Sequence, residues 1–512
     1  MFTRRHVLSA AGLSLAAPAI LRAQSWFADY PFALGVASGD PASDGFVIWT
    51  RLAPDPMGRD TSVPPYALPV QWEVADSERF STIVARGEAL ARPELGHSIH
   101  VEVAGLQPDR PYWYRFTLGK DRSMRGRART LPAPGARPQS LRFGVCGCQN
   151  YEDGYYTAYR HLAMERDLAF VFHYGDFIYE YRKDNQFDRH NLPAPIVRRH
   201  AQREIYSLDD YRRQYGQYLL DMDLQAARSA HSFLSTFDDH EVHNNWVGDI
   251  DQDPVPPEVF ALRKAVAMQV WYEHMPVRAA LLPRGGAIAL NRRIRVGDLA
   301  AINLLDTRDY RTDQPCGDGF KPVCPGVADP KAAVLGAAQE AWLDASFARK
   351  DATWTCLAQQ IMMMPLDRRR YDDETEKILN IDSWAGYDAP RNRLMSRLAR
   401  VDNAVVLTGD EHQNFAGLLY DKDKPVATEC VLTSISSGGD GQDLRDGSDR
   451  LLANNPQLKF VNDQRGYGVC EVTQEAWKTH FMVVDKVSER GAPVKRRTTM
   501  TMPRGEVSLS LG

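Results

Sequence analysis

Six short apolar segments beyond residue 140 end abruptly in polar residues, and this pattern limits the folds open to the chain more than any other feature. In one segment, Val405, Val406 and Leu407 lack the alternation of a half-exposed strand, which indicates a strand buried on both faces. Asp410 and His412 follow directly. The six segments, in chain order, are LRFGVCGCQ, LAFVFHYGD, SFLSTFDDHE, LAAINLLDTR, TWTCLAQQ and NAVVLTGDEH.

Amphipathic stretches lie between these segments, for example residues 330–350, and their spacing is typical of helices. Strands that alternate with helices predict an α/β domain built on one open sheet. Such sheets bind ligands at the carboxyl ends of their strands, so we expect the six polar endings to converge on a single crevice. One ending alone would favour a helix N-cap or a turn, but six together favour a site.

The strand endings supply several side chains that bind metal ions or phosphate. They are Cys148, Asp176, Tyr179, Asp238, Asp239, His240, Glu241, Asp306, Arg308, Asp410 and His412. Acids that share a crevice repel one another, which raises the pKa of some of them. Bound cations would relieve that repulsion, so we predict a metal site.

The mixture of ligand types indicates which cations fit. Oxygen-rich positions suit calcium, magnesium or manganese, whereas a thiolate and a phenolate beside a carboxylate and an imidazole favour a transition metal. A free phenol titrates near about 10 and coordinates at neutral pH only when a strongly Lewis-acidic ion displaces its proton. Ferric iron is therefore the candidate. Zinc stays an alternative, although Tyr is not among its usual ligands.

A crevice with several cations and carboxylates is a common solution for displacement at phosphorus, because paired ions hold both oxygens and generate hydroxide at neutral pH. His240 is then the candidate proton donor to the departing alcohol. Arg308 is the candidate phosphate-binding residue. A structural ion pair with a carboxylate is an equally open role for Arg308. No GxSxG or other activated-serine motif competes with this interpretation.

The segment before these strands looks all-β. Residues 31–130 contain short runs rich in β-branched and aromatic residues, separated by turn formers, which predict a small β-sandwich. In GLQPDRPYWYRF, Tyr112 is placed to cap a corner of a fibronectin-like sandwich. Residues 131–140 are rich in Pro and Gly and predict a linker to a second domain at 141–505.

Residues 1–23 have the pattern of a removable export signal, with Arg4 and Arg5 before an apolar stretch that is too short for a membrane span. The adjacent arginines are typical of the twin-arginine type, which predicts a periplasmic or secreted protein exported in the folded state by that machinery. No other run is long enough to cross a bilayer. The formal charge of −4 is mild, so no nucleic-acid partner is expected, although a nucleotide substrate stays open.

The seven cysteines leave at least one thiol outside any disulfide. Cys316 and Cys324 flank a short loop that a disulfide could close. Cys146, like Cys356 and Cys470, is expected to be an inert buried residue. A thiol redox protein built on the CGC sequence is a third hypothesis, although the spacing is not the usual C-x-x-C.

Several sequence blocks together resemble the PhoD family of alkaline phosphatases and phosphodiesterases, which also includes phospholipase D-like members. The blocks are FALGVASGDPASDGFVIWTRL, GDFIYE, DDHEVHNNW, LLDTRDYR, WTCLAQQIMM and TGDEHQNF. The resemblance implies a fibronectin/Ig-like sandwich followed by a calcineurin-like metallophosphoesterase domain. That domain is a four-layer αββα sandwich with two mixed sheets, which replaces the single sheet expected from spacing alone.

The resemblance also implies the metal ligands. Ferric iron is expected at Cys148, Asp176, Tyr179 and His412, with Asp176 bridging. More than one calcium ion is expected, with Asp239 and Asp410 as ligands. His240 matches the His that assists the leaving group. Two departures concern the thiol: Gly147 stands where the family commonly has Ser, and Cys146 is a second Cys, but Gln149 favours Cys148 as the ligand.

The sequence therefore predicts a secreted metal-dependent phosphoesterase, a hydrolase of phosphate monoesters, diesters or both. The alternatives are a phospholipase D-like phosphodiesterase and a non-catalytic protein that binds cell-envelope polymers or lipids. The preferred ester, the number of calcium ions and the oligomeric state stay open.

Overall fold

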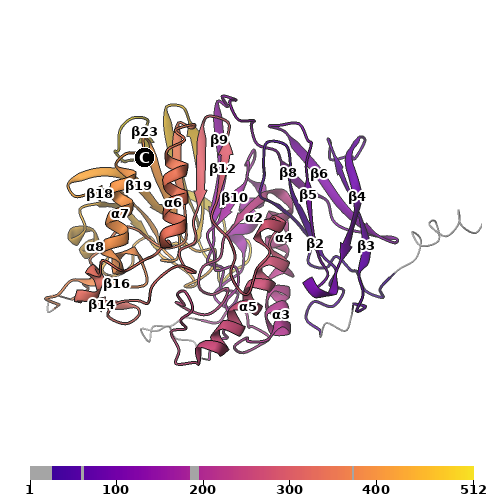
Figure 1. The fold of residues 1–512 in the computed structure, drawn as a ribbon, viewed down its shortest axis with the longest axis horizontal. Coiled ribbons are helices and arrows are strands. Elements are labelled where there is room, and N and C mark those ends of the chain that lie inside the picture. Colours follow the sequence, from indigo (N-terminus) through magenta and orange to yellow (C-terminus); the bar gives the residue numbers. More distant parts are fainter. Residues whose placement is uncertain (1–25, 59–62, 185–194, 372–373) are drawn as a thin grey trace, which may run out of the picture.

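The computed structural model describes residues 26–58, 63–184, 195–371 and 374–512. The expected export signal at 1–23 lies outside these residues. Two large sheets lie beside each other, and the N-terminal strands stand at one end of the molecule (Figure 1).

The larger sheet has ten strands and is parallel at its centre. Its parallel strands are β9 (Ser140–Cys146), β10 (Val171–His173), β11 (Ser232–Ser235) and β1 (Val36–Gly39). Antiparallel strands extend it on one side with β21 (Gly466–Thr473), β22 (Ala476–Val484), β23 (Val494–Pro503) and β24 (Ser510–Leu511), and on the other with β2 (Phe46–Arg51) and β5 (Ser98–Val103).

The second sheet has seven strands, four of them parallel. Its order is β12 (Arg292–Val296), β13 (Ala300–Leu304), β15 (Trp354–Ala358), β17 (Ala404–Thr408), β19 (Lys424–Val431), β18 (Asn414–Asp421) and β20 (Leu458–Asn462). The six strands expected from the sequence all form, but β9, β10 and β11 belong to the larger sheet and β13, β15 and β17 to the smaller. The prediction of a single open sheet is therefore wrong, whereas two mixed sheets are what the resemblance implied.

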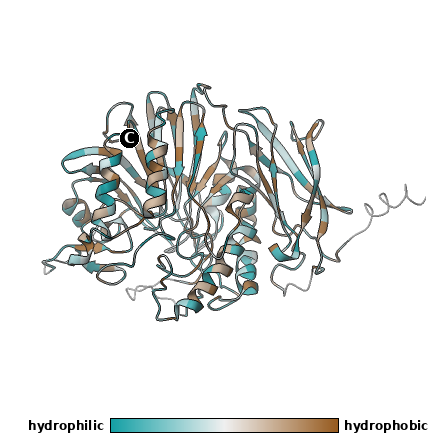
Figure 2. Cartoon of the chain, in the orientation of Figure 1, coloured by the Kyte–Doolittle hydropathy of each residue, from teal (hydrophilic) through white to brown (hydrophobic). Residues whose placement is uncertain are grey.

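The strands are apolar on both faces because each sheet packs on two sides. Successive side chains of a strand point to opposite faces. Val145 and Phe172 of the larger sheet meet Ile302 and Leu407 of the smaller in one buried cluster. Their strand neighbours pack outward against helices, which explains the continuous apolar runs. Hydrophobic positions recur along the strands and helices of both sheets (Figure 2).

The helices are segregated by sheet. Those against the larger sheet are α2 (Thr157–Met164), α3 (Leu208–Leu219), α4 (Met222–Ala230) and α5 (Pro257–His274), and those against the smaller are α6 (Gly336–Phe347) and α7 (Asp388–Leu398). The expected helix within 330–350 is α6. A short helix, α8 (Ser448–Asn454), precedes β20. In the part of the chain that the structure describes, no helix combines the length and the hydropathy that a membrane span requires.

The N-terminal region forms a separate five-stranded sheet that packs on the end of the large one. Its strands are β3 (Leu68–Ala75), β4 (Ile83–Ala91), β6 (Pro111–Leu118), β7 (Asp121–Arg122) and β8 (Gly126–Arg129). Tyr112 caps a corner as expected: its hydroxyl accepts the Gln107 N–H at 3.0 Å and donates to the Gln107 carbonyl at 3.2 Å. The opposing strands β1, β2 and β5 are continuous with the large sheet, because Ser38 of β1 pairs in parallel with Ser232 of β11.

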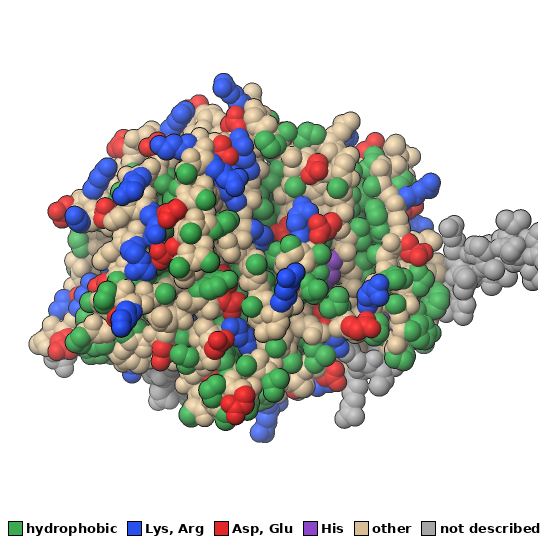
Figure 3. Space-filling view, viewed as in Figure 1, with side chains coloured by type: hydrophobic (Ala, Val, Ile, Leu, Met, Phe, Trp, Pro, Cys, Tyr) green, Lys and Arg blue, Asp and Glu red, His purple; other side chains and the backbone are tan. Residues whose placement is uncertain are grey.

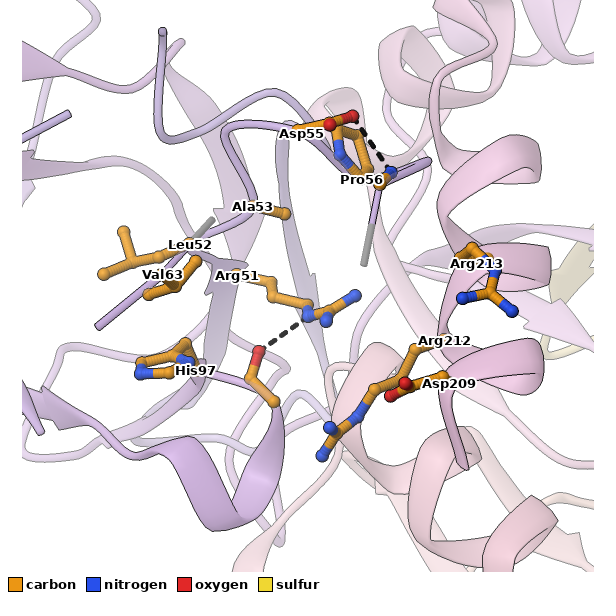
Figure 4. Close-up of a pocket in the computed structure, with 12 residues that line it drawn as sticks. Arg51, Leu52, Ala53, Asp55, Pro56, Val63, His97, Asp209, Arg212 and Arg213 are labelled. Atoms are coloured by element: carbon orange, nitrogen blue, oxygen red, sulfur yellow. Dashed lines mark hydrogen bonds between the residues drawn. The ribbon is translucent and has the colours of Figure 1, made fainter. Parts of the chain in front are cut away.

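Buried charges join the N-terminal strands to the helices. Arg51 of β2 and Arg212 of α3 lie on the two sides of a small pocket (Figure 4). Arg51 donates to the Gly96 carbonyl at 2.7 Å, and its Nη1 lies 3.1 Å from Nε2 of His274 at the end of α5. Arg212 binds Glu273 of α5 through two hydrogen bonds of 2.8 and 2.7 Å. On the outer surface, Lys and Arg side chains are interspersed with Asp and Glu over the face in Figure 3.

Candidate metal centre

The ends of the central strands of both sheets open into one cavity of about 620 Å³. Most of the residues expected at the site line it, namely Asp176, Tyr179, Asp239, His240, Asp410 and His412. Parallel strands of two facing sheets thus bring residues from three separate parts of the chain to one edge.

Three groups of side chains in this cavity have ligand atoms within 4.8 Å of one another. They are Cys148, Asp176 and His412; Asp176, Asp239 and His240; and Asp238, Asp239 and Asp410. Asp176 belongs to the first two groups and Asp239 to the last two, so the groups form a continuous row. The Tyr179 hydroxyl joins the first group, because it lies 2.9 Å from Asp176 Oδ2 and 3.2 Å from His412 Nε2.

Four of these residues have a left-handed backbone, which non-glycine residues rarely adopt. The φ angles are 49° at Cys148, 55° at Asp176, 66° at Asp410 and 53° at His412. Each costs on the order of 1–3 kcal/mol and persists only where the surrounding structure imposes it, which is common at functional sites. The strands turn sharply at these positions and direct the side chains into the cavity.

Tyr174 explains why glycines precede two of these turns. A Cβ atom at Gly147 or at Gly409 would lie 2.2 Å from the Tyr174 ring. The ring fills the space between the two strand ends, so both positions need glycine. The family that the sequence resembles commonly has Ser where this chain has Gly147. In this chain the Tyr174 ring occupies the space that a Ser side chain would need.

Several carboxylate oxygens of the row make no hydrogen bond within the part of the chain that the structure describes. Asp176 Oδ1, Asp238 Oδ2 and Asp239 Oδ1 are buried and have no hydrogen-bond partner among the described residues. Burial and the neighbouring Asp239 carboxylate raise the pKa of Asp176 well above its usual value, and burial with Asp238 and Asp239 does the same for Asp410. Orphaned oxygens beside a thiol, a phenol and an imidazole fit bound cations.

Glu241 supports the row from behind. Its carboxylate accepts the backbone N–H groups of Asp176 at 3.0 Å, Phe177 at 2.7 Å and Asp238 at 2.9 Å. It therefore fixes the ends of β10 and β11 relative to each other. The sequence placed Glu241 among the strand endings but did not indicate this role.

His240 stands at the edge of the row, facing the cavity. Its ring stacks on Tyr179 with centroids 4.0 Å apart, and its Nδ1 lies 2.8 Å from Glu180 Oε2. Burial lowers the pKa of His240, but the carboxylates of Glu180, Asp239 and Asp176 outweigh burial and raise it well above the usual value. Glu180 therefore orients the ring and favours its protonated form, a role that sequence reasoning missed.

Arg308 is not among the residues that line the cavity, which favours the structural ion pair over the phosphate-binding role that the sequence left equally open. The side chain is 0% exposed, and its Nε lies 2.6 Å from Asp238 Oδ1. Its Nη2 lies 2.9 Å from Asp382 Oδ2. These contacts are those of a structural ion pair beneath the row, because the guanidinium is occupied by carboxylates and closed off from substrate.

The two thiols of CGC point to different surroundings. Cys148 belongs to the first ligand group, whereas Cys146 packs on the helix side with its Sγ 3.9 Å from the Tyr159 hydroxyl. Cys356 and Cys470 are buried as expected. The cysteines of CGC are thus not paired with each other, and Cys316 and Cys324 form a disulfide.

The disulfide closes a loop that forms one wall of the cavity. Asp318 lies inside this loop and lines the cavity. It accepts two hydrogen bonds of 2.8 Å from the Asn245 side chain, and the Asn245 backbone N–H donates to Asp239 Oδ2 at 2.8 Å. Within the same loop, β14 (Phe320–Pro322) pairs with β16 (Ile378–Asn380), which leads to Asp382.

Replacing both Cys316 and Cys324 by Ser is expected to lower the free energy of unfolding by about 2.5 kcal/mol, the chain-entropy value for a loop of this length. It should also weaken cation binding at Asp239 by about tenfold, since groups behind a ligand have effects of this size. Thermal unfolding and cation titration of the metal-free protein measure the two effects. Asp318→Asn keeps the disulfide and should reproduce only the binding effect; unchanged cation affinity in both variants would contradict the link.

Known proteins are similar to this chain over most of its length. A family model described as PhoD-like phosphatase matches residues 143–481, and one described as the N-terminal domain of PhoD-like phosphatase matches residues 16–132. The chain is 43% identical over 490 residues to alkaline phosphatase D of Bacillus subtilis (strain 168), covering 94% of this chain and 82% of that protein. A solved structure titled "Structure of PhoD" superimposes with a TM-score of 0.91 at 43% identity, covering 95% of this chain and 93% of that one.

Proposed function

Because the chain belongs to the PhoD-like phosphatase family, and is therefore a hydrolase of phosphate esters, we propose that it is a secreted, metal-dependent phosphoesterase for monoesters, diesters or both. The observation that carries the metal dependence is the continuous row of ligand groups that share Asp176 and Asp239. A phospholipase D-like activity or a non-catalytic binding role has no comparable observation in its favour.

We assign ferric iron to Cys148, Asp176, Tyr179 and His412, and more than one calcium ion to the acidic part of the row with Asp239 and Asp410. Asp238 joins the second set, because it shares a ligand group with both acids. The thiol and the phenol support a strongly Lewis-acidic ion at one end, and the carboxylates support hard cations at the other. When bound, such ions supply Lewis acidity and a nucleophilic hydroxide at neutral pH.

Two residues of the chain act beside the ions: His240 donates a proton to the leaving group, and Arg308 holds a ligand in place. His240 faces the cavity with Glu180 behind it, so its imidazolium is positioned to give a proton to the departing alkoxide. Arg308 holds Asp238 in place and is not available to the phosphoryl oxygens.

The fold and the location are proposals of the same kind. The two packed sheets with outer helices support a four-layer αββα metallophosphoesterase sandwich, and the Tyr112 corner supports a fibronectin- or Ig-like N-terminal sandwich. Residues 1–23 support export in the folded state by the twin-arginine route.

Cys148→Ser tests the iron assignment. Thiolate and phenolate ligands on ferric iron should give the native protein a visible charge-transfer band, and loss of the thiolate should shift or remove that band while the fold is kept. Absorption spectra with metal analysis measure this, and Cys146→Ser is the matched control because its thiol lies outside the row. A colourless, iron-free native protein would contradict the assignment.

Hydrolysis of paired aryl phosphate monoesters and diesters tests the function itself. The protein is purified from the exported fraction and assayed with calcium present, then after chelation, then after calcium is restored. We expect turnover that chelation removes and calcium restores, and the preferred ester separates a phosphatase from a phosphodiesterase. Full turnover by protein shown to be metal-free would overturn the metal dependence.

A further inference from the structure

The two ends of the cavity are lined by side chains of different charge. One end holds the acidic row, and the other end is lined by arginines, including Arg368, Arg445 and Arg465. Residues 410–412 separate the two ends. Asp410 and His412 face the ligand groups, whereas Glu411 between them pairs with Arg368 at 2.6 Å.

Two of these arginines are occupied by the protein. The Arg368 side chain is 8% exposed and pairs with Glu411. The Arg465 side chain is 4% exposed and donates to the His412 carbonyl and, at 2.6 Å, to the Asp463 carbonyl. They form a fixed basic wall and leave few donors for a ligand.

Arg445 differs from both. Its side chain is 45% exposed, and the nearest carboxylate oxygen that it faces, on Asp463, is 3.8 Å away, beyond hydrogen-bond distance. Asp463 is already bound by Arg465 at 3.1 Å. Burial lowers the pKa of Arg445, and the nearby charges of Arg368 and Arg465 act in the same direction, whereas Asp463 and Glu411 raise it. An anion there would gain a charged hydrogen bond without displacing one.

The loop that carries Arg445 is anchored on the molecule. Asp443, two residues earlier, accepts from Arg497 at 3.0 Å and from the Asn462 side chain at 3.0 Å. Asp446 also lines this end and brings one negative charge. The anchored backbone holds the Arg445 guanidinium toward the cavity at a lower entropic cost than a free loop would.

We propose that Arg445 forms a second anion-binding subsite, which holds a phosphate or carboxylate group on the alcohol part of an ester whose reacting phosphate lies at the acidic end. The inference rests on the proposed phosphoesterase function and deepens it, because it names a substrate class: phosphate esters whose alcohol carries a second negative charge. Arg445 would select substrates and would not take part in bond cleavage.

Two diesters with the same leaving group test the subsite. Methyl para-nitrophenyl phosphate has no second anion, whereas phosphoalkyl para-nitrophenyl phosphates carry one on alkyl spacers of increasing length. A carboxyalkyl series separates a requirement for phosphate from one for any anion. The metal-loaded native protein is compared with Arg445→Ala, Arg445→Lys and the control Arg496→Ala, an exposed arginine of β23 outside the cavity.

The native protein should prefer the anionic diester at one spacer length. The ratio of kcat/KM between anionic and methyl diesters should fall about tenfold or more in Arg445→Ala, through KM, because a charged hydrogen bond is lost. Arg445→Lys should keep part of the preference, and Arg496→Ala all of it. An unchanged ratio in Arg445→Ala, with active enzyme, overturns the subsite alone, as does hydrolysis of para-nitrophenyl phosphate but of neither diester. No hydrolysis of that monoester or of either diester by metal-loaded native protein overturns the proposed function and the subsite with it.

Discussion

Replacing Asp176 by Asn is expected to remove bound metal and to lower phosphoesterase activity by about a thousandfold or more, since metal Lewis acidity contributes several kcal/mol to such reactions. Asp176, like Asp239, belongs to two ligand groups, and its Oδ1 has no hydrogen-bond partner among the described residues. Asn keeps the shape of the side chain but replaces one oxygen and removes the charge. Both ligand groups are therefore weakened by one substitution.

The same substitution should not destabilise the metal-free protein. Burial and Asp239 raise the pKa of Asp176, so its charge opposes folding when no cation is bound. The native state then binds more protons than the unfolded chain above the ordinary Asp pKa, and the free energy of unfolding falls as pH rises toward the raised pKa. Asp176→Asn should flatten that decline, because Asn does not titrate.

Metal analysis, turnover and thermal unfolding at several pH values measure these effects together. Asp402→Asn, at an exposed position before β17, is the matched control and should change none of them. Retained metal and turnover in Asp176→Asn would refute the shared-ligand assignment. A collapse of the metal-free fold would instead show that the Asp176 carboxylate is structural.

The strands and the polar endings could be predicted because their cause is local. A strand packed on both faces must be apolar throughout, and Val405, Val406 and Leu407 show this directly. The site residues at the strand ends followed from the same pattern, and the resemblance selected among them. Cys148 over Cys146 is one such choice, and the structure groups Cys148 with Asp176 and His412.

The division into two sheets could not be predicted from spacing, because periodicity shows that a strand is buried and does not show its neighbours. β11 and β13 have the same apolar character, yet β11 pairs with β1 and β10, whereas β13 pairs with β12 and β15. The continuity of β1 with the large sheet was invisible for the same reason. Its pairing partner lies 194 residues further along the chain.

The role of Arg308 depends in part on Asp382, which no sequence motif marked. Asp382 lies outside the six strand endings that the sequence pattern marked, and it meets Arg308 only because the loop after β16 returns beneath the row. Glu180 is visible in the GDFIYE block, but its partner His240 is 60 residues away. Residue type and spacing indicate which groups bind metal, whereas the partners behind them are set by the tertiary fold.

Replacing His240 by Asn is expected to lower kcat for alkyl phosphate esters by about 10²–10⁴-fold, the usual contribution of a general acid. The reason is positional: the ring stacks on Tyr179, and Glu180 holds its Nδ1 at 2.8 Å, which leaves Nε2 toward the cavity. An alkoxide leaves poorly without a proton. A para-nitrophenolate leaves readily, so the same variant should lose much less activity on aryl esters.

The dependence on the leaving group separates proton donation from metal binding, since His240 also belongs to one ligand group. Glu180→Gln keeps the His240 ring in place but removes the carboxylate charge that favours its protonated form. This variant should therefore lose less kcat than His240→Asn, and again mainly on alkyl esters. His161→Asn, on α2 and hydrogen-bonded to the Ala492 carbonyl, is the control.

Equal losses of activity on alkyl and aryl esters in His240→Asn, with reduced metal content, would show that His240 acts as a metal ligand. Equal losses with full metal content would assign His240 to substrate binding. Only a loss confined to poor leaving groups, with metal retained, supports a proton donor, because departure of the alkoxide is the step that the proton assists.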